Sequence, residues 1–380
     1  MEKREACAEI DRRLEEAFAG ENPGKSWKEE HLRDFRTAVE VLSGGSNTVL
    51  VDDWGLPSVM VRISACKNKE LFETGSDILH PAFYSGGEVQ EEIYVSKFQN
   101  VLIDGRGYSL PMRTPAYGLS FDQALQACRS KGAGWNLTPF ALRAVLALEA
   151  KKKGFFPHGN SDKGVDYLHR EEHGEAEEEG VVRTGSGPVT WSHNNSRSGI
   201  YDLTGNLNEW DAGMRLMDGE IQVIPDGMWM REDCTMGMDC RYWRSILPGG
   251  ELAEPGTSGT LRYVCGGDGI LLTAGGELGK EATGNCAFGR IKASEGLKVP
   301  ELLYALMLYP EQEDGYDGWR WIKSRGECLP LCGGGYRALD HAGIFFVGLT
   351  YPRTHNYNLT GFRSVYVKQR NGEVGDKLCR

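Results

Sequence analysis

The sequence lacks long apolar runs and any excess of positive charge. No stretch approaches the 18 consecutive apolar residues that indicate a membrane-spanning helix, and the charged start, MEKREACAEIDRRLEEAF, has no apolar core of the signal-peptide kind. Acidic residues outnumber basic ones by 54 to 43, giving a net charge of −11, whereas nucleic acids are held by Lys and Arg. We therefore expect a chain that is made in the cytoplasm, does not insert into a membrane and does not bind nucleic acid.

Motifs of common enzyme classes are also missing. The sequence contains no P-loop, no G-x-G-x-x-G between a strand and a helix, and no G-x-S-x-G. Its ten cysteines are scattered without a C-x-x-C pair, which argues against the disulfide framework of a small secreted protein. We expect reduced, mostly buried thiols, with a Cys328–Cys332 or a Cys234–Cys240 link as the alternatives.

Glycine and tryptophan are what the sequence has in quantity. Fifty Gly residues without a period imply many tight turns and long loops, and nine Trp residues imply large apolar anchors that pin those loops. The length of 380 residues permits two or three domains or one large irregular one. The composition favours the latter and predicts a loop-rich α+β fold.

The first 85 residues predict a small α/β domain that could attach the protein to a carrier. Two amphipathic helices are expected, at about residues 6–18 and 26–42, the second capped by Ser26. Two short strands should follow around Asp53-Trp54-Gly55, with a further strand near Ile93. We place the domain boundary between about residues 66 and 90, so that a second domain spans 86–380.

The second domain should begin with two helices. Ser120 and Gln123 form an S-x-x-Q capping box for a helix that ends near Lys131. Thr138-Pro139 should cap and start another helix, which runs to Lys153 and is closed by Gly154. The polar and acidic stretch at about residues 160–190 predicts a solvated loop.

The closing segment, residues 326–367, combines a strand pattern with a mixed set of side chains. Successive side chains of a strand point to opposite faces, so one alternate set can be core. The core set is Phe345, Val347 and Leu349. The exposed set, with the residues just beyond it, mixes aromatic, small, hydroxyl and imidazole groups, which suits a binding surface: Phe346, Gly348, Thr350, Tyr351, Thr354, His355 and Tyr357.

Short motifs lie in a fixed order along this segment. They are Leu329-Pro330-Leu331, Gly333-Gly334, Ala342-Gly343-Ile344-Phe345, Val347, Leu349, Pro352-Arg353 and Gly361-Phe362-Arg363. This order resembles the closing segment of the variable proteins of diversity-generating retroelements, which occur in phage tails and on bacterial surfaces. The sequence departs from the family at Cys332, where Arg is usual, and at Tyr336, where Trp is usual.

The resemblance implies a C-type lectin fold of the formylglycine-generating-enzyme type. GIYDLTGNLNEW, residues 199–210, looks like the G-x-Y-D-x-x-G-N-x-x-E-W signature of that fold. In the family, the positions between the motifs derive from asparagine-rich template codons whose adenines are randomised. The ligand-binding variable positions implied here are Gly335, Tyr336, Arg337, Ala338, Asp340, His341, Phe346, Gly348, Thr350, Tyr351, Thr354, His355, Tyr357 and Leu359.

An enzyme is the alternative reading, because the best-known member of the fold oxidises a substrate cysteine with two cysteines of its own. Those cysteines would fall at Ala338 and Gly343 here, and neither is cysteine. Cys328 and Cys332 lie on the wrong side of the glycine motif. We therefore expect no catalytic residues, and keep a formylglycine-generating-type oxidase-like enzyme or a degenerate relative as the alternative.

Two patterns could hold a metal. His169-Arg170-Glu171-Glu172-His173 matches H-x-x-E-H, but its polar, acidic surroundings favour a solvated loop. Asp202, Asn206, Asn208 and Glu209 could supply oxygens to calcium, but Asp and Asn also cap turns. We favour the structural reading of both and expect no metal and no cofactor. The sugar-binding triplets of calcium-dependent lectins are absent.

The function expected is therefore recognition of a receptor on a cell surface, protein or glycan, by a phage virion tail protein or a prophage product. Tyr336, Tyr351 and Tyr357 should dominate the binding energy, with polar contacts from Arg337 and His341. Phage tail proteins are possible partners, and a homo-oligomer would add avidity. A structural virion protein without a diversified role is a third reading.

Overall fold

The chain has an α+β architecture with few helices, many short strands and long loops, as the composition predicted. A computed structural model describes residues 29–266, 269–276 and 279–368. Its helices are α2 (Glu29–Leu42), α3 (Phe121–Arg129), α4 (Phe140–Lys153) and α5 (Glu301–Ala305). Within these residues, no helix is both long and apolar enough to cross a membrane. The helix expected at residues 6–18 and the Ser26 cap lie outside the described residues.

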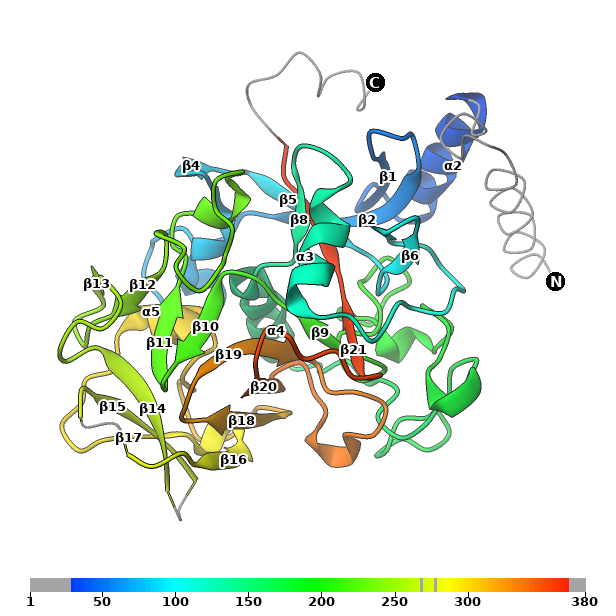
Figure 1. Cartoon of the computed structure of the whole chain (residues 1–380). Helices are drawn as coiled ribbons and strands as arrows, with labels where there is room; N and C mark the ends of the chain where they lie inside the picture. The colour runs from blue at the N-terminus through cyan, green and yellow to red at the C-terminus, as the bar shows by residue number, and fades with distance from the viewer. Residues whose placement is uncertain (1–28, 267–268, 277–278, 369–380) are drawn as a thin grey trace.

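The first sheet has five strands in the order β1-β2-β5-β22-β8. They are β1 (Asn47–Val51), β2 (Pro57–Ser64), β5 (Glu92–Ser96), β22 (Ser364–Tyr366) and β8 (Trp135–Leu137). At the predicted β1–β2 turn, Asp52 Oδ1 accepts hydrogen bonds from the backbone N–H groups of Trp54 (3.0 Å) and Leu56 (2.9 Å), which is ordinary Asp turn chemistry. Because β2 pairs with β5, strands from both sides of the expected domain boundary share one sheet (Figure 1).

The second sheet has 13 strands, nine of them in one path in the order β16-β18-β20-β19-β10-β11-β14-β15-β17. In that order they span Thr283–Ala287, Trp319–Lys323, Val347–Tyr351, Glu327–Cys332, Met214–Met217, Glu220–Val223, Leu261–Gly266, Gly269–Ala274 and Lys292–Ala293. The strands joined to this path are β9 (Asn208–Trp210), β12 (Arg244–Ile246), β13 (Leu252–Ala253) and β21 (Thr360–Phe362). Two separate hairpins are β3 (Tyr84–Ser85) with β4 (Glu88–Val89), and β6 (Val101–Ile103) with β7 (Arg106–Tyr108).

Two of the predicted helix boundaries are confirmed, at the start of α3 and at the end of α4. The Ser120 hydroxyl accepts a hydrogen bond from the Gln123 N–H, and the Gln123 side chain accepts one from the Ser120 N–H, which confirms the capping box. α4 ends at Gly154, which has the left-handed φ of 68°. Thr138 does not cap α4, because its hydroxyl donates to the Arg363 carbonyl instead, at 2.8 Å.

One buried apolar cluster unites the two sheets with α3 and α4. It contains Ile93 of β5, Leu142 of α4, Leu216 of β10 and Leu349 of β20. The closing segment enters this core twice, first as β19 and β20 in the second sheet and then as β22 in the first. Its two ends are therefore fixed in different sheets (Figure 1).

Candidate binding surface

The predicted core face of the closing segment is confirmed. Phe345, Val347 and Leu349 are each 0% exposed and belong to the main apolar cluster. β20 pairs with β19 on one side and with β18 on the other, so its backbone is held along both edges. β20 is therefore rigid, and the side chains on its opposite face are held in fixed positions.

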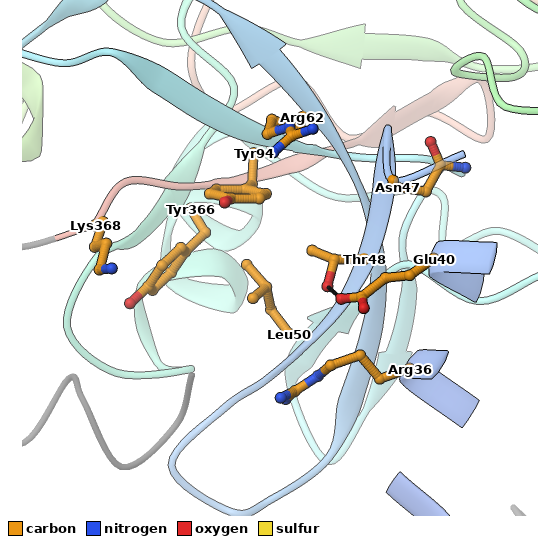
Figure 2. A pocket seen from close by; sticks show the side chains of 10 residues that line it. Arg36, Glu40, Asn47, Thr48, Leu50, Arg62, Tyr94, Tyr366 and Lys368 are labelled. Atoms are coloured by element: carbon orange, nitrogen blue, oxygen red, sulfur yellow. Dashed lines mark hydrogen bonds between the residues drawn. The ribbon is translucent and has the colours of Figure 1, made fainter. Parts of the chain in front are cut away.

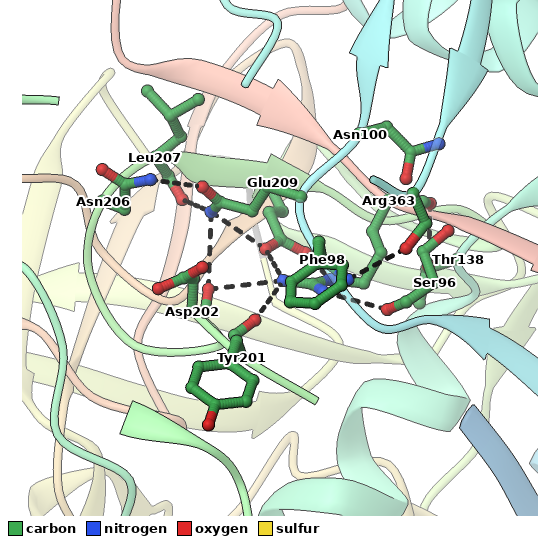
Figure 3. A network of polar contacts seen from close by, with 12 residues as sticks. Ser96, Phe98, Asn100, Thr138, Tyr201, Asp202, Asn206, Leu207, Glu209 and Arg363 are labelled. Atoms are coloured by element: carbon green, nitrogen blue, oxygen red, sulfur yellow. Dashed lines mark hydrogen bonds and ion pairs between the residues drawn. The ribbon is translucent and has the colours of Figure 1, made fainter. Parts of the chain in front are cut away.

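A buried polar network lies beneath this part of the chain (Figure 3). Its centre is Glu209 of the G-N-x-x-E-W signature, 1% exposed, which accepts hydrogen bonds from Arg143 Nη2 (2.6 Å) and Arg363 Nη2 (2.7 Å). Burial alone raises the pKa of Glu209, but the guanidinium groups of Arg363 and Arg143 together bring it down to about 2. The network therefore ties α4 and β9 to the Gly-Phe-Arg motif.

Two other signature residues hold turns. Asn206 (φ 58°) accepts a hydrogen bond from the Val182 N–H (2.9 Å) and donates to the Gln99 side chain (2.8 Å). Asp202 (φ 61°) accepts from the Gly185 N–H at 3.1 Å, and burial raises its pKa to about 6. These contacts match the structural reading of the signature. A carboxylate shared by two guanidinium groups, as Glu209 is, does not suit a cation.

A set of rings lies on the outward face of β18 and β20. Trp321 pairs in register with Gly348, so the two residues share a face. A Cβ atom built on Gly348 would lie 3.9 Å from the rings of both Phe346 and Tyr351. Gly348 therefore lies between Trp321, Phe346 and Tyr351 and has no side chain to fill the space among their rings.

Two histidines extend this set. The His341 ring lies 4.1 Å from that of Trp319 and 5.9 Å from that of Trp321, measured between centroids. His355 stacks on Tyr351 at 3.9 Å and lies 4.9 Å from Tyr357. We call the whole set the aromatic face; its members are Trp319, Trp321, His341, Phe346, Tyr351, His355 and Tyr357. Burial lowers the pKa of His355, which favours its neutral, stacking form.

Exposure on the aromatic face rises toward the loop that follows β20. Tyr351 is 39% and Tyr357 71% exposed, whereas the other five rings are half-buried. Thr354 is also exposed, and Thr350 is half-buried. Large apolar rings that remain exposed beside a rigid strand are a common property of interaction sites.

The structure corrects the surface position expected for three residues. Tyr336 is only 1% exposed: its ring packs in a cluster with Val181 and Leu207, and its backbone bonds to Asn206 and Lys163. Gly335 and Gly348 are buried as well. Tyr336 therefore contributes packing beneath the surface rather than a ring on it.

The remaining expected positions form the turn beside the aromatic face and the end of the loop. Arg337 and Asp340 are exposed, while Ala338 and Leu359 are half-buried. The Arg337 guanidinium lies 5.1 Å from the centre of the Tyr336 ring. The structure thus places most of the expected residues in a turn and a loop that precede and follow β20.

Sequence reasoning missed Trp319 and Trp321. Both precede the closing segment, and both are half-buried with their rings near His341. The signal was present: Trp319, Trp321 and Lys323 alternate with the buried Arg320 and Ile322, as on a strand with one outward face.

The cysteines are free thiols in the part of the chain that the structure describes. Cys328 and Cys332 lie four residues apart on β19, roughly 13 Å at strand spacing, which is too far for a disulfide. The Sγ atoms of Cys234 and Cys240 lie 3.7 Å apart and are not bonded. Burial raises the pKa of Cys328 to about 11 and also raises that of Cys332 well above its usual value, so both thiols are held in the unreactive form.

The H-x-x-E-H stretch is a folded loop rather than a helix. The His169 ring stacks on that of His158 at 3.6 Å, and Glu172 accepts a hydrogen bond from the Trp191 indole at 3.0 Å. Among the described residues, no group of three or more His, Cys, Asp or Glu side chains is arranged to hold a metal ion.

These observations define a loop-rich α+β protein whose second sheet presents an exposed aromatic face. No family model matches the sequence. A search of curated proteins finds no match either. Among solved structures, PvdO from Pseudomonas aeruginosa is similar at 11% sequence identity and a TM-score of 0.30, over 84% of this chain and 97% of that chain. Because this structural likeness is weak, the proposals below depend on the chain's own geometry.

Proposed function

We propose that this protein binds a receptor or ligand through the aromatic face and is a hypervariable protein diversified by a retroelement, with a C-type lectin-type scaffold. One observation carries the proposal. In the closing segment, motif residues such as Phe345, Val347 and Leu349 are fully buried, whereas Tyr351 and Tyr357 between the motifs are exposed. Substitution at the exposed positions should have little effect on stability, because those side chains lie outside the buried core.

The aromatic face suits recognition for energetic reasons. Tyrosine and tryptophan supply large contact areas at a small cost in side-chain entropy, and they dominate measured interface energies. Trp319 and Trp321 lie outside the segment that resembles the variable region, so they would offer the same contacts in every variant. Variable residues would then set specificity around this constant part.

The setting that we propose is a phage tail or a prophage product, with a protein or glycan receptor on a cell surface. One copy of the aromatic face is small and is expected to bind a receptor weakly. Several copies on one tail, or a homo-oligomer, raise the effective affinity by avidity without new contacts.

The DNA beside the gene tests this proposal directly. We expect a near-repeat of the coding segment for residues 326–367, differing at adenines of the template, next to a reverse transcriptase. The differences should fall at codons for residues at the end of β20 and in the loop after it, including the exposed Tyr351 and Tyr357 and the half-buried His355, and should spare those for Phe345 and Val347. If no near-repeat exists, or if its differences fall on the codons for the core residues Phe345, Val347 and Leu349, the diversification proposal fails.

The alternative is an oxidase-like enzyme of the formylglycine-generating type. It needs two reactive thiols after the glycine motif, where this chain has Ala338 and Gly343. A Cβ atom at Gly343 would lie 2.5 Å from the Gly318 nitrogen, so a cysteine does not fit there. Incubation of the protein with copper, oxygen and a cysteine-containing peptide should give no peptide aldehyde beyond that formed without the protein. Turnover to an aldehyde would replace the binding proposal with the enzyme.

A further inference from the structure

A cavity of about 470 Å³ opens on the first sheet, which carries no residue of the aromatic face. Its walls come from α2, β1, β2, β5 and β22, and from Lys368 directly after β22 (Figure 2). This volume is typical of sites that hold a small organic molecule. The proposed receptor-binding function gives this cavity no role.

The charge of the cavity is opposite to that of the chain. Three cationic side chains line it, Arg36, Arg62 and Lys368, against one acidic side chain, Glu40. The lining therefore has a formal charge of +2 (three minus one) in a chain whose net charge is −11. The Glu40 carboxylate accepts a hydrogen bond from the Thr48 hydroxyl at 2.6 Å, which turns it toward β1.

Two of these cations, Arg62 and Lys368, are placed so that they can receive an anion. Arg36 Nε donates to the Val49 carbonyl at 3.0 Å, which fixes this guanidinium at the wall. Arg62 makes one long ion pair, at 3.8 Å, with Glu92, and Lys368 has no acidic partner within the described residues. Guanidinium and ammonium groups together are the usual donors to phosphate and carboxylate oxygens.

An apolar and aromatic wall lies between these cations. The rings of Tyr94 and Tyr366 lie 6.4 Å apart at 56°, and Tyr366 packs against Trp135, which holds it in place. Leu50, 8% exposed, completes this wall. Figure 2 shows Tyr94, Tyr366 and Leu50 between the side chains of Arg62, Lys368 and Arg36.

We propose that this cavity binds a small ring compound that carries a phosphate or carboxylate group. The ring packs on Tyr94, Tyr366 and Leu50, and the oxyanion receives hydrogen bonds from the surrounding cations. Each half of the ligand has its own set of contacts, so each half can be tested separately.

Calorimetric titration of the full chain tests both halves, with phenyl phosphate and inorganic phosphate as the two probes. We expect phenyl phosphate to bind at one site per chain and at least about tenfold more tightly than inorganic phosphate, a difference of about 1.4 kcal/mol. The double variant Arg62→Gln/Lys368→Gln should weaken both probes by about tenfold or more. The matched control, Arg290→Gln/Lys298→Gln, removes two exposed cations elsewhere and should change neither.

Tyr94→Leu tests the aromatic half. The variant should bind phenyl phosphate no more tightly than inorganic phosphate. Its affinity for inorganic phosphate should equal that of the parent protein. The proposal is overturned if phenyl phosphate gives no binding up to about 10 mM, if both probes bind equally, or if the control variant loses as much affinity as the double variant. Circular dichroism of each variant separates loss of binding from loss of folding, and the double variant alone remains a sufficient test if Tyr94→Leu does not fold.

Discussion

Arg353 forms a two-point ion pair with Glu327 behind the loop that carries His355 and Tyr357. Arg353 Nε donates to Glu327 Oε2 at 2.7 Å, and Nη2 donates to Oε1 at 2.9 Å. Glu327 also accepts a hydrogen bond from Arg215 Nη1 at 2.9 Å. The Pro-Arg motif is thereby tied to β19 and to β10, which fixes the point where the loop leaves the sheet.

We predict that Glu327→Gln destabilises the protein by about 3–5 kcal/mol, because it leaves Arg215 without its buried counter-charge and Arg353 with only the exposed Asp122. The Glu327 side chain is only 5% exposed, and those of Arg353 and Arg215 are 15% and 4% exposed. Urea unfolding followed by circular dichroism measures the loss. Asp122→Asn is the matched control: Asp122 also pairs with Arg353 but is 55% exposed, so its loss should cost less than about 1 kcal/mol.

Tyr357 and Tyr336 were both predicted to be surface residues, but replacing them should have different effects on stability. Tyr357→Ala should change the free energy of unfolding by no more than about 0.5 kcal/mol, because the ring is 71% exposed. Tyr336→Ala should cost about 3–5 kcal/mol, because that ring is 1% exposed and its loss leaves a cavity. Thermal and urea unfolding of both variants measure the two changes in the free energy of unfolding. Equal losses would contradict the division between surface and core on which the proposed function depends.

A second pair of variants compares two glycines of the closing segment. Gly348→Ala should be tolerated within about 0.5 kcal/mol, because the nearest atom to its new Cβ would lie 3.7 Å away. Gly343→Ala should cost about 1–3 kcal/mol, since its Cβ would lie 2.5 Å from the Gly318 nitrogen and 2.7 Å from the Asp317 carboxyl. Unfolding curves at one pH measure both. A destabilised Gly348→Ala would show that position 348 cannot vary freely.

Asp317 should give the protein a pH-dependent stability. Burial raises the pKa of its carboxyl to about 7, although the Ile344 N–H donates to Oδ2 at 3.0 Å. The folded state holds this proton more tightly than the unfolded state. The protonated carboxyl therefore contributes its full stabilisation of the folded state below about pH 4, and this stabilisation is lost as the pH rises through 7. The size is on the order of 2–4 kcal/mol.

Asp317→Asn should remove this part of the pH dependence, because the amide oxygen can still accept the Ile344 bond and carries no charge. The free energy of unfolding, measured from pH 4 to pH 8, should fall less steeply in the variant than in the parent. Asp314→Asn, whose side chain is 87% exposed, is the control and should leave the slope unchanged. Parallel curves for parent and Asp317→Asn would contradict the assignment.

Local signals predicted much of the fold. The capping box at Ser120 and the left-handed Gly154 set the ends of α3 and α4, because those residues bond to the backbone within the helix itself. The alternation at β20 correctly separated Phe345, Val347 and Leu349 as core. These features depend on a few neighbours in sequence, which is why they can be read from it.

The burial of Tyr336 and the strand that lies beside Trp319 could not be predicted in the same way. Tyr336 is buried by Val181 and Leu207, which come from loops that precede it by well over a hundred residues. Trp319 belongs to the surface only because β18 pairs with β20 in parallel, and a parallel pairing leaves no local mark on either strand. Long-range packing, rather than residue type, decides which rings remain exposed.

The place of β22 between β5 and β8 makes folding depend on the correct synthesis of the segment that precedes it. A frameshift or a stop codon anywhere in residues 326–363 removes β22 and leaves two strands with unpaired inner edges, which favours aggregation and degradation. A point substitution on the aromatic face leaves β22 intact. The strand order therefore makes completion of the first sheet depend on an intact reading frame through β22, whereas a substitution confined to the aromatic face does not affect it.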